Sequence, residues 1–169
     1  MTSRNLKRFA ASGGAAALAL ASILVFGSAL KTQALSQEVV AHNGLEGAWR
    51  LQLTVRDCQT GAALRSFPAL ANFAKGGTLT VTTAGQRPSL STPPLGIWRR
   101  TGLHAYSAAS EAFIFSPAGA WIQTHRLTRA IVLSDDGDAF TDTVALQIID
   151  TNGNQIVTGC ATSIATRFR

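Results

Sequence analysis

Hydrophobic and polar residues alternate along much of the chain after residue 47. Trp49, Leu51, Leu53 and Val55 occupy every second position, with polar or charged residues between them. A period of two places the two sets of side chains on opposite faces of a strand, so this segment predicts a β-strand with one buried and one exposed face. The same alternation returns between residues 140 and 148.

Six further segments have strand-like composition, and turn signals separate them. Gly76-Gly77 and Asn152-Gly153 mark two of the turns, the second being a strong hairpin signal because both residues tolerate positive φ. We therefore predict eight strands and no helix. The predicted strands cover residues 49–56, 67–73, 78–83, 97–100, 103–115, 121–133, 140–148 and 155–168.

Short links between these strands favour antiparallel pairing of neighbours in the sequence. Eight strands paired in this order predict an all-β, up-and-down antiparallel barrel, which leaves no exposed sheet edge. A two-sheet β-sandwich is the alternative. A barrel of eight strands is either filled by its own side chains or holds one small ligand.

The first 34 residues differ from the rest. Arg4, Lys7 and Arg8 precede an uncharged run at residues 9–30, and small residues lead up to Ala34. This order predicts a signal peptide for the general secretory route, cleaved after Ala34, with the mature protein periplasmic or extracellular. A permanent membrane anchor is the alternative, since the run is about long enough to span a bilayer. Residues 35–46 are expected to form a flexible leader, and residues 47–169 a single domain.

The net charge of the chain is small once the first 34 residues are left out. Four of the 15 basic residues and none of the 9 acidic residues precede residue 35, so the remainder has a net charge of about +2. The high isoelectric point of the whole chain is thus due mainly to the basic residues among the first 34, and we expect no nucleic-acid partner.

Two cysteines, Cys58 and Cys160, are the only ones in the chain. In an exported protein two cysteines usually pair, and a barrel would bring them together because Cys58 ends the first strand and Cys160 lies in the last. We predict a disulfide; two free buried thiols are the alternative. Two cysteines alone provide too few ligands for a metal site.

Gly47-Ala48-Trp49 resembles the Gly-x-Trp motif that opens the first strand of lipocalins and related calycin barrels. Arg167, in the last strand, matches the basic residue that packs on that tryptophan in the family. The resemblance implies a lipocalin-like barrel in which Trp49 and Arg167 have a structural role. Allene oxide cyclase and dirigent proteins form a second family of eight-stranded barrels with a similar strand rhythm.

The sixth predicted strand carries the candidate ligand-binding residues. Its more apolar face includes polar side chains, which are costly to bury without partners and which small-molecule sites use to fix orientation. On the fifth strand, Glu111 and Phe113 share a face, from which we expect Glu111 to approach His125 or Arg129. The candidate site residues are Trp121, Gln123, His125, Arg129, Glu111 and Phe113.

The leading hypothesis is an exported barrel that binds a small apolar or amphipathic molecule, without a cofactor or metal. One alternative is a non-enzymatic structural or surface-interaction domain. Another is a cyclase or isomerase that uses Glu111 and His125 for acid–base chemistry. Binding requires an internal void of a few hundred cubic ångströms, and the enzyme hypothesis also requires Glu111 to face it.

Overall fold

Alternating side chains and tight turns build eight β-strands, which the computed structural model describes for residues 44–169. A short 3-10 helix, η1 (Pro88–Leu90), lies in the link between the third and fourth strands. The strands are β1 (Gly47–Arg56), β2 (Ala63–Phe73), β3 (Thr78–Thr83), β4 (Leu95–Arg100), β5 (Ala105–Phe115), β6 (Trp121–Leu133), β7 (Ala139–Asp150) and β8 (Gln155–Arg167).

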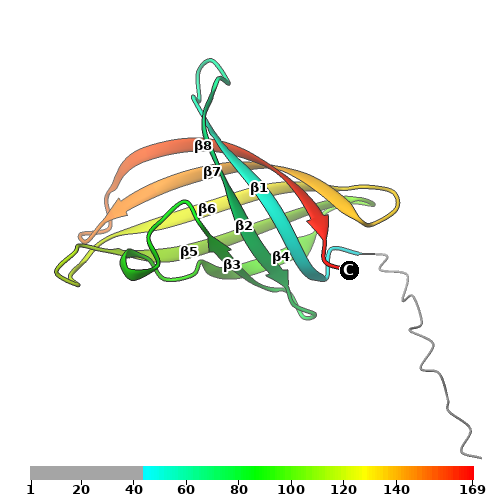
Figure 1. Cartoon of the computed structure of the whole chain (residues 1–169), viewed down its shortest axis with the longest axis horizontal. Coiled ribbons are helices and arrows are strands. Elements are labelled where there is room, and N and C mark those ends of the chain that lie inside the picture. The colour runs from blue at the N-terminus through cyan, green and yellow to red at the C-terminus, as the bar shows by residue number, and fades with distance from the viewer. Residues whose placement is uncertain (1–43) are drawn as a thin grey trace, which may run out of the picture. The chain divides into compact units, whose positions relative to one another are not determined.

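The strands form a closed antiparallel barrel in which each pairs with its neighbours in sequence order (Figure 1). Closure comes from β1, which pairs with β2 on one side and with β8 on the other, in a register running from Trp49 opposite Arg167 to Arg56 opposite Cys160. The predicted up-and-down barrel is therefore confirmed. Its β2 begins four residues earlier than expected, at Ala63.

The predicted disulfide is present and links Cys58, two residues beyond the end of β1, to Cys160 in β8. Their Cα atoms are 5.2 Å apart, and the bond closes a sequence separation of 102 residues. It therefore ties together the two strands whose pairing closes the barrel.

One end of the barrel is filled by side chains. Trp49, Phe73, Leu79 and Ile131 are almost completely buried there, and Phe140 packs edge-on against Trp49 with ring centroids 4.8 Å apart. This end holds the β2–β3, β4–β5 and β6–β7 links, and we call it the packed end. It is the hydrophobic core of the domain.

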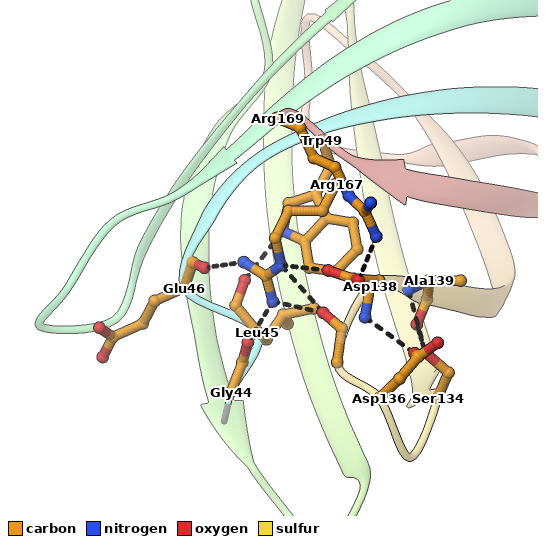
Figure 2. Close-up of polar contacts among 11 residues, drawn as sticks. Gly44, Leu45, Glu46, Trp49, Ser134, Asp136, Asp138, Ala139, Arg167 and Arg169 are labelled. Carbon is orange, nitrogen blue, oxygen red and sulfur yellow. Dashed lines mark hydrogen bonds and ion pairs between the residues drawn. The ribbon is translucent and has the colours of Figure 1, made fainter. Parts of the chain in front are cut away.

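Arg167 connects the elements that meet at the packed end. Its guanidinium lies over the ring of Trp49, 4.2 Å from the centroid, and donates hydrogen bonds to the backbone carbonyls of Gly44, Glu46 and Gly137 (Figure 2). Burial lowers the pKa of Arg167 from its usual value. These bonds hold the residues before β1 against the end of β8 and the β6–β7 link.

Part of the expected flexible leader is packed against the barrel. Leu45 has no exposed surface, and its carbonyl accepts a hydrogen bond of 2.9 Å from the indole nitrogen of Trp49. Residues 44–46 of the expected flexible leader are thus held against the barrel, because the side chain of Leu45 and the carbonyls of all three residues find partners there. The predicted signal peptide, residues 1–34, and the rest of the leader lie outside the described residues. From residue 44 onward, no helix is long and apolar enough to cross a membrane.

Candidate ligand-binding cavity

The opposite end of the barrel encloses a cavity of about 350 Å³. Inward-facing residues of seven strands line it, and the β3–β4 link contributes the remainder of the wall. Most of the lining is apolar, for example Leu53, Val81, Val144, Leu146 and Ile148. The volume is in the lower part of the range of small-molecule sites.

Small side chains on β5 and β8 leave this space open. Between the inward-facing Tyr106 and Ile114, β5 has small residues at its inward positions, and those that line the cavity are Ser110 and Ala112. On β8 the lining includes Gly159 and Ala161. Larger residues at these positions would fill the barrel, as the aromatic residues do at the packed end. The cavity is thus a direct result of residue size on two strands.

Three polar residues of β6 line the cavity: Gln123, His125 and Arg129. The amide nitrogen of Gln123 donates to Nε2 of His125 over 2.9 Å. Because Nε2 accepts this bond, the neutral imidazole carries its proton on Nδ1. Burial lowers the pKa of His125 below its usual value of 6.5, so the ring is neutral at pH 7.

Arg129 lies deepest of the three, next to the packed end. Its Nη1 donates to Oδ2 of Asp142 on β7, and both side chains are buried. The other carboxylate oxygen of Asp142 accepts bonds from the backbone nitrogen and the hydroxyl of Ser163 on β8, at 2.9 and 2.5 Å. A buried charge pair with further hydrogen bonds therefore holds Arg129 in the wall of the cavity.

Phe67 of β2 lines the cavity and contacts two other lining residues, Arg65 and Gly85. The guanidinium of Arg65 is 5.1 Å from its ring centroid. On the β3–β4 link, a Cβ built on Gly85 would lie 2.5 Å from the same ring, so only glycine allows this approach. The link therefore packs directly against the ring of Phe67 in the wall of the cavity.

Glu111 does not enter the cavity, contrary to expectation. It lies on the outer face of β5, where its carboxylate accepts a bond of 2.6 Å from Nε of Arg126, its cross-strand partner on β6. Phe113 also faces outward, because it alternates along β5 with the buried, inward-facing Ala112 and Ile114. The Glu111–His125 pair of the enzyme hypothesis is therefore not assembled.

Trp121 also lies outside the cavity. The register of β5 and β6 shifts between Ile114 and Phe115, so that Phe115 pairs with Trp121 and the bulge skips Ile122. A bulge of one residue reverses the alternation beyond it, which turns Trp121 to the outer face although Gln123 points inward. There Trp121 packs against Phe113, with ring centroids 5.9 Å apart and both side chains about half exposed.

Of the predicted ligand-binding residues, the structure thus brings Gln123, His125 and Arg129 into one cavity and leaves Glu111, Phe113 and Trp121 on the outer face. Sequence analysis missed Asp142, Ser163 and the small residues of the wall. Within residues 44–169, no group of three or more His, Cys, Asp or Glu side chains is arranged to hold a metal ion.

No protein-family model matches this chain, and no curated protein matches it in sequence. The functional argument therefore depends on the geometry of the cavity.

Proposed function

We propose that this protein is an exported, lipocalin-like carrier whose barrel binds a small apolar or amphipathic molecule. The observation that supports this proposal most strongly is the cavity of about 350 Å³, with mainly apolar walls and a minority of polar side chains, three of them on β6. Ligand sites have this composition because apolar walls supply affinity, whereas a few polar groups fix orientation. A barrel with a purely structural role would be expected to fill this space with side chains.

Two further features support the lipocalin-like and exported character of the protein. Trp49 of the Gly-x-Trp motif lies under the guanidinium of Arg167, the arrangement that the family resemblance implies. The disulfide between Cys58 and Cys160 suits an oxidising compartment outside the cytoplasm. The disulfide also agrees with the export that the signal peptide predicted at residues 1–34 implies.

The test is a native mass spectrum of the mature protein isolated from its own host, compared with its denatured mass. We expect the native mass to exceed the denatured mass by up to a few hundred daltons, which would identify the ligand by weight. The mature denatured mass also tests cleavage after Ala34. Equal native and denatured masses, together with no binding of small apolar compounds in solution, would overturn the carrier proposal.

A pair of variants links binding to the cavity. Ala112→Phe places a ring inside the barrel, opposite His125, whereas Ala109→Phe places the same ring on the outer face of the same strand. We expect Ala112→Phe to abolish the extra mass and Ala109→Phe to retain it. Retention of the extra mass in both variants would place the ligand elsewhere.

A further inference from the structure

Ser110 presents a hydroxyl group without a partner to the cavity. It lies on the inner face of β5, lines the cavity and is only 4% exposed. Its Oγ makes no hydrogen bond within residues 44–169, where Nε of Arg129 is the one polar side-chain atom of a non-exposed residue that lacks both a partner and accessible surface. The hydroxyl of Ser110 therefore has accessible surface, and that surface faces the cavity because the side chain points inward.

Gln123 and His125 supply two further free atoms. Their side chains bond to each other over 2.9 Å and to no other group within the described part of the chain. Oε1 of Gln123 and Nδ1 of His125 are thus free, and both residues are half-buried and line the cavity. For the same reason as the hydroxyl of Ser110, both atoms are accessible.

The three free atoms include donors and acceptors. Nδ1 of the neutral His125 ring donates, Oε1 of Gln123 accepts, and the hydroxyl of Ser110 does either. In the other tautomer His125 donates from Nε2 to Gln123, which frees the amide nitrogen as a donor and Nδ1 as an acceptor. In both tautomers, a ligand that only accepts hydrogen bonds leaves a free acceptor of the cavity without a partner.

The strand register places Ser110 near His125. Ser110 pairs with Leu127, and His125 pairs with Ala112, the next inward residue of β5. Ser110 and His125 are therefore diagonal neighbours on adjacent strands, and such neighbours are about 7–8 Å apart. This separation leaves room for one ligand oxygen between the two side chains, at hydrogen-bond distance from each.

No unbalanced charge lies beside these groups. The guanidinium of Arg129 pairs with Asp142, and His125 is neutral at pH 7 because burial lowers its pKa. Arg65, the other cation of the lining, is exposed on β2, where solvent screens its charge. An anion bound between Ser110 and His125 would lose its hydration without gaining an opposite charge, so the ligand group is uncharged.

We infer that the ligand is an apolar alcohol, whose hydroxyl group accepts a hydrogen bond from Nδ1 of His125 and donates one to Oγ of Ser110. A hydroxyl is uncharged and both donates and accepts through one atom, whereas ketones, ethers and carboxylates only accept. The apolar remainder of the ligand lies against the aliphatic walls. This inference rests on the proposed carrier function, because it concerns the contents of the same cavity.

Four compounds of similar shape test this inference by NMR titration of the mature protein. 1-Phenylethanol presents a hydroxyl group, acetophenone a carbonyl, isopropylbenzene a methyl group in the same place, and benzoate a carboxylate. An apolar cavity of about 150 Å³ is enough to bind benzene, so compounds with one ring fit here. In the wild type, 1-phenylethanol should bind more tightly than acetophenone and benzoate, and it should move the ¹⁵Nδ1 resonance of His125.

A pair of serine variants locates the hydroxyl group of the ligand. Ser110→Ala removes the acceptor in the cavity, whereas Ser107→Ala makes the same change on the outer face of the same strand. The preference for 1-phenylethanol over isopropylbenzene should fall about fivefold in Ser110→Ala, as the loss of one hydrogen bond implies. It should be unchanged in Ser107→Ala.

The two proposals fail in different ways. If the compounds bind but acetophenone or benzoate binds more tightly than 1-phenylethanol, or if Ser110→Ala keeps the full preference, the inference is wrong and the carrier function stands. An Nδ1 resonance that is insensitive to bound 1-phenylethanol has the same meaning. The comparisons on the wild type decide the matter even if Ser110→Ala does not fold. If none of the compounds binds and the native and denatured masses are equal, the carrier function is overturned together with the inference.

Discussion

At the scale of single residues, the two buried arginines have different roles. Arg167 uses its guanidinium fully, against three backbone carbonyls and the face of Trp49, and it stabilises the packed end. Arg129 pairs with Asp142, and its buried Nε has no hydrogen-bond partner within residues 44–169. Arg167 thus stabilises the packed end, whereas Arg129 lines the cavity.

His125 makes the stability of the barrel depend on pH. Burial lowers its pKa in the folded state, so the unfolded chain binds a proton more readily as the pH falls below 6.5. The free energy of unfolding should therefore be highest above pH 6.5 and decrease as the pH falls from 6.5 toward the folded-state pKa. Urea unfolding at several pH values measures this decrease, which should be smaller in His125→Asn.

An NMR titration of the imidazole provides the independent check. The midpoint in the folded protein should lie below 6.5, and a midpoint above that value would contradict the prediction. The pKa values of Asp57, Asp136 and Asp150 are themselves lowered from 3.8 by hydrogen bonds, so these carboxylates titrate below the range of the experiment.

At the scale of elements, the approach of β4 to β5 depends on one glycine. A Cβ on Gly96 would lie 1.9 Å from the carbonyl oxygen of Ala109 and 2.6 Å from Cα of Ser110, so the backbone of β5 would have to move. We expect Gly96→Ala to lower the free energy of unfolding by about 3 kcal/mol, measured by urea denaturation.

Gly159 of β8 is the matched control for that variant. It lies in a strand without positive φ, and the nearest atom to a Cβ there is a methyl group of Leu146 at 3.4 Å. Because an alanine fits at this position and loses less chain entropy on folding, Gly159→Ala should change the free energy of unfolding by less than about 1 kcal/mol. Equal losses in the two variants would show that the close approach at Gly96 is unimportant.

The strands themselves could be predicted from the sequence, and so could their order, because alternation and turn residues are local signals. Which face of β5 points inward could not. Sequence analysis turned the face with Glu111 and Phe113 toward the cavity, but the alternate face, with Ala112 and Ile114, is the buried one. The bulge at Ile122, which turns Trp121 outward, leaves no trace in composition. The Asp142 partner of Arg129 depends on strand register, which a single sequence does not specify.

At the scale of the whole molecule, the disulfide reinforces the closure of the barrel. Cross-linking residues separated by 102 positions restricts the unfolded chain, with an expected stabilisation of about 5 kcal/mol. The double variant Cys58→Ser and Cys160→Ser should lose stability of this size in urea denaturation under oxidising conditions. A reductant should destabilise the wild type and leave the double variant unchanged; equal stability of both proteins would contradict the prediction.

The pairing of β1 with β8 also has a consequence for how the chain acquires its structure. As the chain is delivered from its N-terminus to the compartment where it folds, β1 arrives first and β8 last, so one side of β1 stays without its partner until almost all of the chain is available. Over that interval the backbone groups of β1 offer a template that any other extended chain can join, including β8 of a neighbouring molecule. The pairing of β1 with β8 removes every sheet edge from the folded barrel, but because it forms late, it also leaves the incomplete chain exposed to aggregation.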